Sequence, residues 1–200
     1  MVISLANETF LYGVDTEKVT SLMKDTGENV KYFNETSNSI ASEQTKLLDD
    51  LMKKLYIIVR KSDDITTRVL ENYYLELTNL LYFMGDKLEQ LGIFGDMSKA
   101  AAKEVYNAAY LSNQIKDSDK KNKTTVAENQ AVADQKSQYE QVVSSIYEHA
   151  YKIVKYKIDA GFEMINTLRK IISRRMQEES LSSSQFKVPM NLNNNNGGRL

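Results

Sequence analysis

The sequence predicts an all-α protein, an elongated bundle of three to four long helices with coiled-coil character. Residues 15–179 contain no proline, no cysteine and only five glycines, so little in this range interrupts a helix. Apolar residues recur there in steps of three and four, the spacing of one helix face. The composition changes at both ends. We therefore expect an extended N-terminal arm over 1–14, a helical domain over 15–179, and an extended or disordered Ser/Asn-rich C-terminal tail over 180–200.

The first helix is expected from residue 15 to residue 60, with Asp15 or Thr16 as its N-cap. A seven-residue repeat follows, which predicts a coiled-coil seam with two polar interruptions, Ser37 and Gln44. A break at Gly27 or within the Asn/Ser-rich stretch 34–42 is the alternative. The two rows of the repeat are Val19, Thr26, Phe33, Ile40 and Leu47, and Met23, Val30, Ser37, Gln44, Leu51 and Ile58.

The second helix is expected over 65–91, capped by Ser62 or Asp63. Its apolar stripe is the widest of the chain, which predicts that this helix is the most buried element. Gly92 is expected to end it, and Gly95–Asp96 is expected to turn the chain.

Residues 97–179 form either one very long helix or two helices. The polar run 117–125 has no apolar side chain, so packing cannot hold it, and a turn between antiparallel helices or a frayed tip is favoured. Four cations, Arg169, Lys170, Arg174 and Arg175, lie near the end of the last helix, where they complement the helix dipole.

Composition excludes several classes of function. The net charge of −1 gives no electrostatic basis for nucleic acid or anionic lipid as the main partner. The absence of cysteine excludes disulfides and thiolate metal sites. Residues 1–13 lack the basic region of a secretory signal, and the most apolar stretch, 75–83, is too short to span a membrane. A soluble protein of the virion or the cytoplasm is favoured, with an exported filament as the alternative.

Candidate catalytic groups are few. His149 is the only histidine, and no second histidine accompanies it as a metal ligand. The acid pairs 49–50, 63–64 and 178–179 are expected on solvated helix surfaces and caps rather than around a pocket. The glycines do not have phosphate-loop spacing, and no ExxH motif of a di-iron bundle is present. We expect no enzyme activity, no cofactor, no metal and no small-molecule substrate.

The C-terminal helix is locally basic. Lys152 and Lys155 alternate with Tyr151 and Tyr156, which resembles a nucleic-acid face in outline. Acids such as Asp159 interrupt this pattern, so a mixed exposed face is the favoured interpretation.

Both ends of the chain carry alternating apolar residues, which suits extended segments with one buried face. Pro189 would restrict the tail to an edge or a groove. The aromatic cluster of the 65–91 helix, with Leu75 and Leu81, is too wide for one stripe, so part of it should face another helix or subunit. The expected assembly residues are Leu5, Phe10, Tyr12, Phe33, Tyr73, Tyr74, Phe186, Val188 and Met190.

This outline resembles two classes of self-assembling protein. One is the helical structural proteins of tailed-phage virions, such as head-to-tail connector or ring subunits, whose extended termini clasp neighbours. The other is the extracellular coiled-coil filament subunits of type III secretion, which the LGIF motif at 91–94 before an Ala/Gln/Asn-rich helix resembles. The long polar tail departs from the second class. We expect a homo-oligomeric structural subunit that contacts itself and other structural proteins, with a monomeric binding or regulatory module as the alternative.

Overall fold

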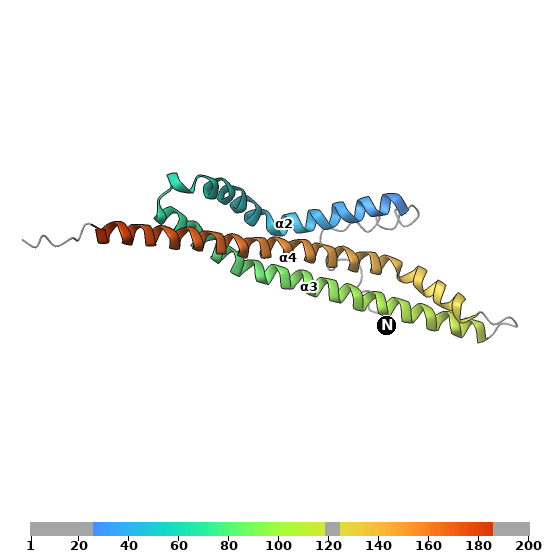
Figure 1. The fold of residues 1–200 in the computed structure, drawn as a ribbon. Helices are drawn as coiled ribbons and strands as arrows, with labels where there is room; N and C mark the ends of the chain where they lie inside the picture. The colour runs from blue at the N-terminus through green and yellow to red at the C-terminus, as the bar shows by residue number, and fades with distance from the viewer. Residues whose placement is uncertain (1–25, 119–124, 186–200) are drawn as a thin grey trace, which may run out of the picture.

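The computed structural model describes residues 26–118 and 125–185. Within these residues all regular structure is helical: α2 (Thr26–Arg60), the short 3-10 helix η1 (Ser62–Asp64), α3 (Thr67–Ser118) and α4 (Val126–Gln185). The three long helices pack into an elongated all-α bundle, as the sequence predicts (Figure 1). The predicted extended arm over 1–14 lies outside the described residues.

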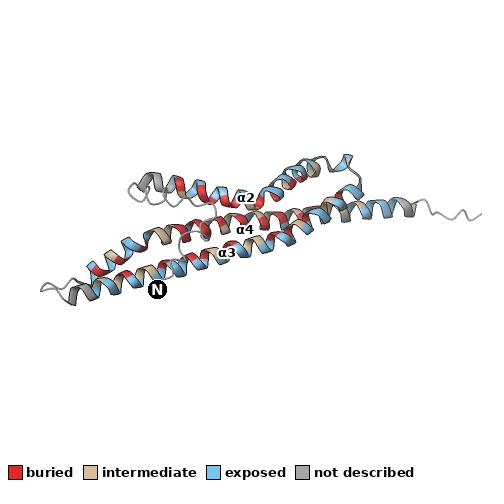
Figure 2. Ribbon diagram, turned by 180° about the vertical axis from the view of Figure 1, so that it is seen from behind, coloured by how far each residue is buried: buried red, intermediate tan, exposed pale blue. Residues whose placement is uncertain are grey.

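α3 and α4 form a long antiparallel hairpin. They have 52 and 60 residues, which corresponds to lengths of ~80 and ~90 Å. Positions on α3 that face α4 repeat every seven residues, as do those on α4, and Figure 2 shows the buried residues where the helices meet. On α3 one row of the repeat comprises Leu70, Leu77, Met84, Leu91 and Ser98, and a second row comprises Leu81, Leu88, Gly95, Ala102 and Ala109. This is the spacing of a coiled-coil seam, while supercoiling itself remains a prediction.

α4 is the central helix of the bundle. In both overall views it lies between α2 and α3 (Figures 1 and 2). Its residues Ile146, Ala150 and Val154 are fully buried in the common core. The prediction that the 65–91 helix is the most buried element is therefore wrong, because the extra apolar width of that helix points away from α4 (see below).

The prediction that Gly92 ends a helix and that Gly95–Asp96 turns the chain is also wrong, since α3 continues to Ser118. Both glycines lie where α3 packs closely on α4. A Cβ on Gly92 would lie 3.6 Å from the Tyr151 ring, and one on Gly95 would lie 3.8 Å from Cβ of Tyr147. A Cβ at either position would make only ordinary van der Waals contact with α4, so the packing does not require glycine there, and no turn occurs.

Two other boundaries differ from the prediction. Residues 62–64 form the helix η1 in the connection, and α3 begins only at Thr67, where the carbonyl of Thr66 accepts from the amides of Val69 and Leu70. α4 reaches Gln185, so the first six residues of the predicted tail, 180–185, are helical. The favoured turn after residue 117 is consistent with α3 ending at Ser118 and α4 beginning at Val126.

A reciprocal pair of hydrogen bonds begins α4. The Thr125 amide donates to Glu128 Oε2 at 2.7 Å, and the Glu128 amide donates to Thr125 Oγ1 at 3.3 Å. This capping box satisfies two of the amide groups that the first turn leaves without helical partners.

α2 packs mainly on α4 and runs as one helix through the stretch 34–42. Figure 1 shows it changing direction near its middle. The second predicted row is partly buried as expected, with Ser37 and Leu51 inside. The first row is displaced by one residue after Ile40, since Leu48 is 1% exposed whereas Leu47 is 65% exposed.

Candidate interaction surfaces

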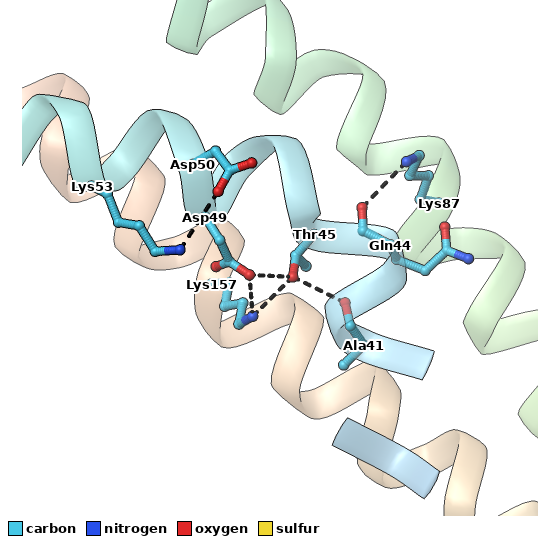
Figure 3. Close-up of polar contacts among 8 residues, drawn as sticks. All are labelled: Ala41, Gln44, Thr45, Asp49, Asp50, Lys53, Lys87 and Lys157. Carbon is cyan, nitrogen blue, oxygen red and sulfur yellow. Dashed lines mark hydrogen bonds and ion pairs between the residues drawn. The ribbon is translucent and has the colours of Figure 1, made fainter. Parts of the chain in front are cut away.

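A polar cluster joins α2 to α4 near the middle of the molecule (Figure 3). Lys157 Nζ on α4 lies 2.6 Å from Asp49 Oδ2 and donates to Thr45 Oγ1 at 2.8 Å. The Thr45 hydroxyl in turn lies within hydrogen-bonding distance of Asp49 Oδ2 and of the Ala41 carbonyl. The Lys157 and Asp49 side chains are 27% and 33% exposed, so the pair is partly shielded from water. Its donors and acceptors engage each other, which is the arrangement of a structural tether.

Two further polar contacts fix α2. Lys87 of α3 donates to the Gln44 carbonyl at 3.2 Å (Figure 3), and the buried Ser37 hydroxyl donates to the Ile146 carbonyl at 3.3 Å. Ser37, the first polar interruption of the predicted repeat, is thus hydrogen-bonded within the core through its side chain. Gln44, the second, accepts a hydrogen bond from Lys87 through its backbone carbonyl.

The single histidine and the acid pairs lie in separate contacts, and two of the pairs share one cation, since Arg174 lies 3.9 Å from Asp63 and 3.6 Å from Glu178. The His149 ring lies 5.4 Å from the Phe33 ring, centroid to centroid, in the half-buried contact of α4 with α2. Asp49 belongs to the tether, while Asp50 pairs with Lys53 at 3.5 Å on the exposed side of the same helix. In the ranges that the structure describes, no group of three or more His, Asp or Glu residues is placed to hold a metal ion.

Three of the predicted assembly residues lie in the described bundle, and all three pack against its core. Phe33, Tyr73 and Tyr74 are half-buried. The Arg169 guanidinium lies 6.0 Å from the centre of the Tyr74 ring and donates to its hydroxyl at 3.2 Å. The structure therefore assigns these rings to packing within the chain, and an additional role in assembly stays a prediction. The other six, Leu5, Phe10, Tyr12, Phe186, Val188 and Met190, lie outside the described residues.

The side of α3 opposite its seam is apolar and exposed. At 3.6 residues per turn, residues 75, 82, 93 and 111 fall on one line, directly opposite Leu77 and Met84. Tyr82 is 77% exposed, and the neighbouring Phe83 ring contacts it edge to face at 5.4 Å. We call this surface the α3 outer face; its exposed apolar side chains are those of Leu75, Tyr82, Phe83, Ile93, Met97 and Leu111. Of the aromatic cluster that was expected to be too wide for one stripe, Tyr82 and Phe83 are exposed together with Leu75, whereas Leu81 faces α4 in the core.

The outward side of the C-terminal half of α2 is basic. It carries five cations with Ile57, which is 57% exposed, at its centre. Tyr56 lies at its edge, with the Arg60 guanidinium 4.7 Å from the ring centre. We call this surface the α2 basic face; its members are Lys46, Lys53, Lys54, Ile57, Arg60 and Lys61.

The hollows on the surface are shallow. One of about 630 Å³ borders the α2 basic face and is lined by Asp49, Met52, Lys53, Tyr56 and Ile57. A second, of about 270 Å³, lies between α3 and α4 and is lined by Leu91, Gly92, Gly95, Asp96, Glu148, Tyr151 and Lys152. Both are open to solvent, unlike an enclosed small-molecule site with a few convergent polar groups.

The mixed face predicted for the C-terminal helix is present on α4. Lys152, Lys155 and Tyr156 are exposed there together with Asp159 and Glu163. Residue spacing thus predicted this surface correctly. It did not predict the basic face of α2, whose lysines lie within the predicted first helix and could have been grouped by the same 3.6-residue period.

No protein-family model matches the chain, and no curated protein or solved structure is significantly similar to it. Among the described helices, none is both long enough and apolar enough to cross a membrane.

Proposed function

We propose that this chain is a non-enzymatic structural subunit that assembles with further copies of itself. The observation that carries the proposal is the α3 outer face. Large apolar side chains follow one line of this helix from Leu75 to Leu111, and Tyr82, Phe83 and Ile93 are each at least half exposed. Large apolar side chains that recur along one exposed line, between charged ones, mark a protein contact more often than isolated surface residues do.

The rest of the molecule supports this proposal. The polar groups of the α2–α4 cluster are committed to each other, and the hollows are open and shallow. A rigid, elongated helical body with an apolar outer line is suited to side-by-side packing of copies. Ring-forming virion proteins and secreted filaments are the two kinds of assembly that the sequence outline resembles, and we propose the virion ring first.

Light scattering with matched variants tests the proposal. The wild-type chain should give a mass that is a multiple of 22.9 kDa. The double variant Tyr82→Ser/Ile93→Ser should approach the monomer mass with unchanged helical content, because both side chains are exposed in the single chain. The control Tyr156→Ser/Phe162→Ser removes two exposed aromatic rings from α4 and should assemble like the wild type.

Negative-stain images of the same samples separate a closed ring from an open filament. A wild-type chain that stays at 22.9 kDa at every concentration would overturn the proposal and favour a monomeric binding module.

A further inference from the structure

We propose that copies of this chain join head to tail, with the α2 basic face of one copy docked on the α3 outer face of the next. This inference rests on the proposed function and specifies which two surfaces make the contact. The charges on the two faces, their positions on the bundle and the hollow beside one of them carry it.

The α3 outer face is acidic as well as apolar. Glu71, Asp86, Glu89, Asp96 and Glu104 lie along the same exposed line as its apolar side chains. Acids outnumber cations on this face, which also carries the exposed Arg68 and Lys103. Lys87 and Lys99 lie to its sides and are bonded to the Gln44 carbonyl and to Glu148.

The α2 basic face has the complementary character. Its cations surround Ile57, and the outward acid in this segment, Asp50, is paired with Lys53. The open hollow beside Ile57 and Tyr56 is lined by Met52 as well as by Asp49 and Lys53. An aromatic ring projecting from the next copy fits this position, and Tyr82 and Phe83 are the rings that α3 presents.

Charge also disfavours the symmetric alternatives. A two-fold contact between two α3 outer faces would set carboxylates against carboxylates, and a contact between two α2 basic faces would set cations against cations. Like charges placed opposite each other oppose association. The heterologous contact pairs opposite charges and is favoured for that reason.

The placement of the two faces allows the contact to repeat. α2 and α3 both pack on α4 and meet each other at Gln44 and Lys87 (Figure 3), and each face points away from α4. A copy can therefore use its α2 basic face for one neighbour and its α3 outer face for another. A heterologous contact of this kind produces a ring if the rotation closes and a filament if it does not.

Charge reversal on the full-length chain tests the contact. The α3 variant Asp86→Lys/Glu89→Lys and the α2 variant Lys46→Glu/Lys54→Glu should each reduce the light-scattering mass to that of a monomer. All four residues are exposed, so the helical content and the melting temperature should stay near those of the wild type. The matched controls are Lys155→Glu/Lys170→Glu and Asp159→Lys/Glu163→Lys on α4, which make the same charge changes away from both faces and should leave assembly intact.

Mixing the two monomeric variants provides the decisive result. The reversed α3 face of one variant is complementary to the reversed α2 face of the other, and the unchanged faces are also complementary. An equimolar mixture should therefore assemble again, and so should a chain that carries all four substitutions.

The failures are distinguishable. If the wild type assembles and either single-face variant assembles equally well, the head-to-tail contact is wrong while self-assembly stands; the same holds if the mixture stays monomeric. A wild-type monomer would overturn both proposals.

Discussion

Replacing Gly161 by alanine tests how closely α3 and α4 approach. A Cβ at this position would lie 2.8 Å from Cδ2 and 3.2 Å from Cδ1 of Leu81, a side chain that is only 3% exposed. Gly85 is the matched control, since it is also inside a helix but a Cβ there would meet no atom within 4 Å. Both substitutions remove the conformational cost of a glycine in a helix, which is ~0.5–1 kcal/mol. Only Gly161→Ala adds a steric conflict.

The magnitudes follow from these contacts. Gly85→Ala should raise the free energy of unfolding by ~0.5–1 kcal/mol. Overpacking a closely fitted core costs ~1–3 kcal/mol, so Gly161→Ala should be close to neutral or destabilising by up to ~2 kcal/mol. Urea titrations at one protein concentration, compared by their midpoints at constant slope, measure this difference. If Gly161→Ala stabilised the chain as much as Gly85→Ala, the described packing of α3 on α4 at Leu81 would be refuted.

Three further predictions concern single side chains. Leu77→Ala should lower the free energy of unfolding by ~2–5 kcal/mol because Leu77 is fully buried, whereas the exposed Leu75→Ala should change it little; equal denaturation midpoints would contradict this. Lys157→Met should lower the free energy of unfolding by ~1–2 kcal/mol, because it leaves the partly shielded Asp49 carboxylate without its cation. This value lies between those typical of exposed and of buried ion pairs. Burial raises the pKa of Tyr147, so above pH ~10 the unfolded chain loses this proton first and the stability falls. Tyr147→Phe should reduce this loss of stability at alkaline pH, measured as melting temperature against pH. A pH profile equal to that of the wild type would contradict this prediction.

The helix boundaries show which local signals were decisive. Gly92 and Gly95 suggested a turn, yet the seven-residue repeat of Leu77, Met84 and Leu91 continues in phase to Ser98, which a turn would have interrupted. The start of α4 could also have been predicted from the sequence. A threonine followed three residues later by a glutamate is the signature of a capping box, and Thr125 and Glu128 have this spacing.

Other features depend on tertiary contacts and could not be read locally. Lys157 and Asp49 are far apart in the sequence, and only the register of α2 on α4 brings them together. The choice between Leu47 and Leu48 for the core depends on the same register, since both residues are apolar and adjacent.

The most instructive error concerns the central helix. A wide apolar arc predicted that the 65–91 helix is the most buried element, but the arc is divided between a seam on α4 and the opposite outer face. The width of an apolar arc indicates how much apolar surface of a helix needs a packing partner. It does not indicate whether that partner belongs to the same chain. The excess that misled the prediction, Leu75, Tyr82 and Phe83, is the surface on which the proposed assembly depends.

Sedimentation of the wild-type chain over a series of concentrations tests the proposal of self-assembly most directly. The proposal predicts species at multiples of 22.9 kDa whose proportion rises with concentration. Raising the ionic strength should reduce that proportion, because salt screens exposed charges. A single species of 22.9 kDa at all concentrations would contradict the proposal.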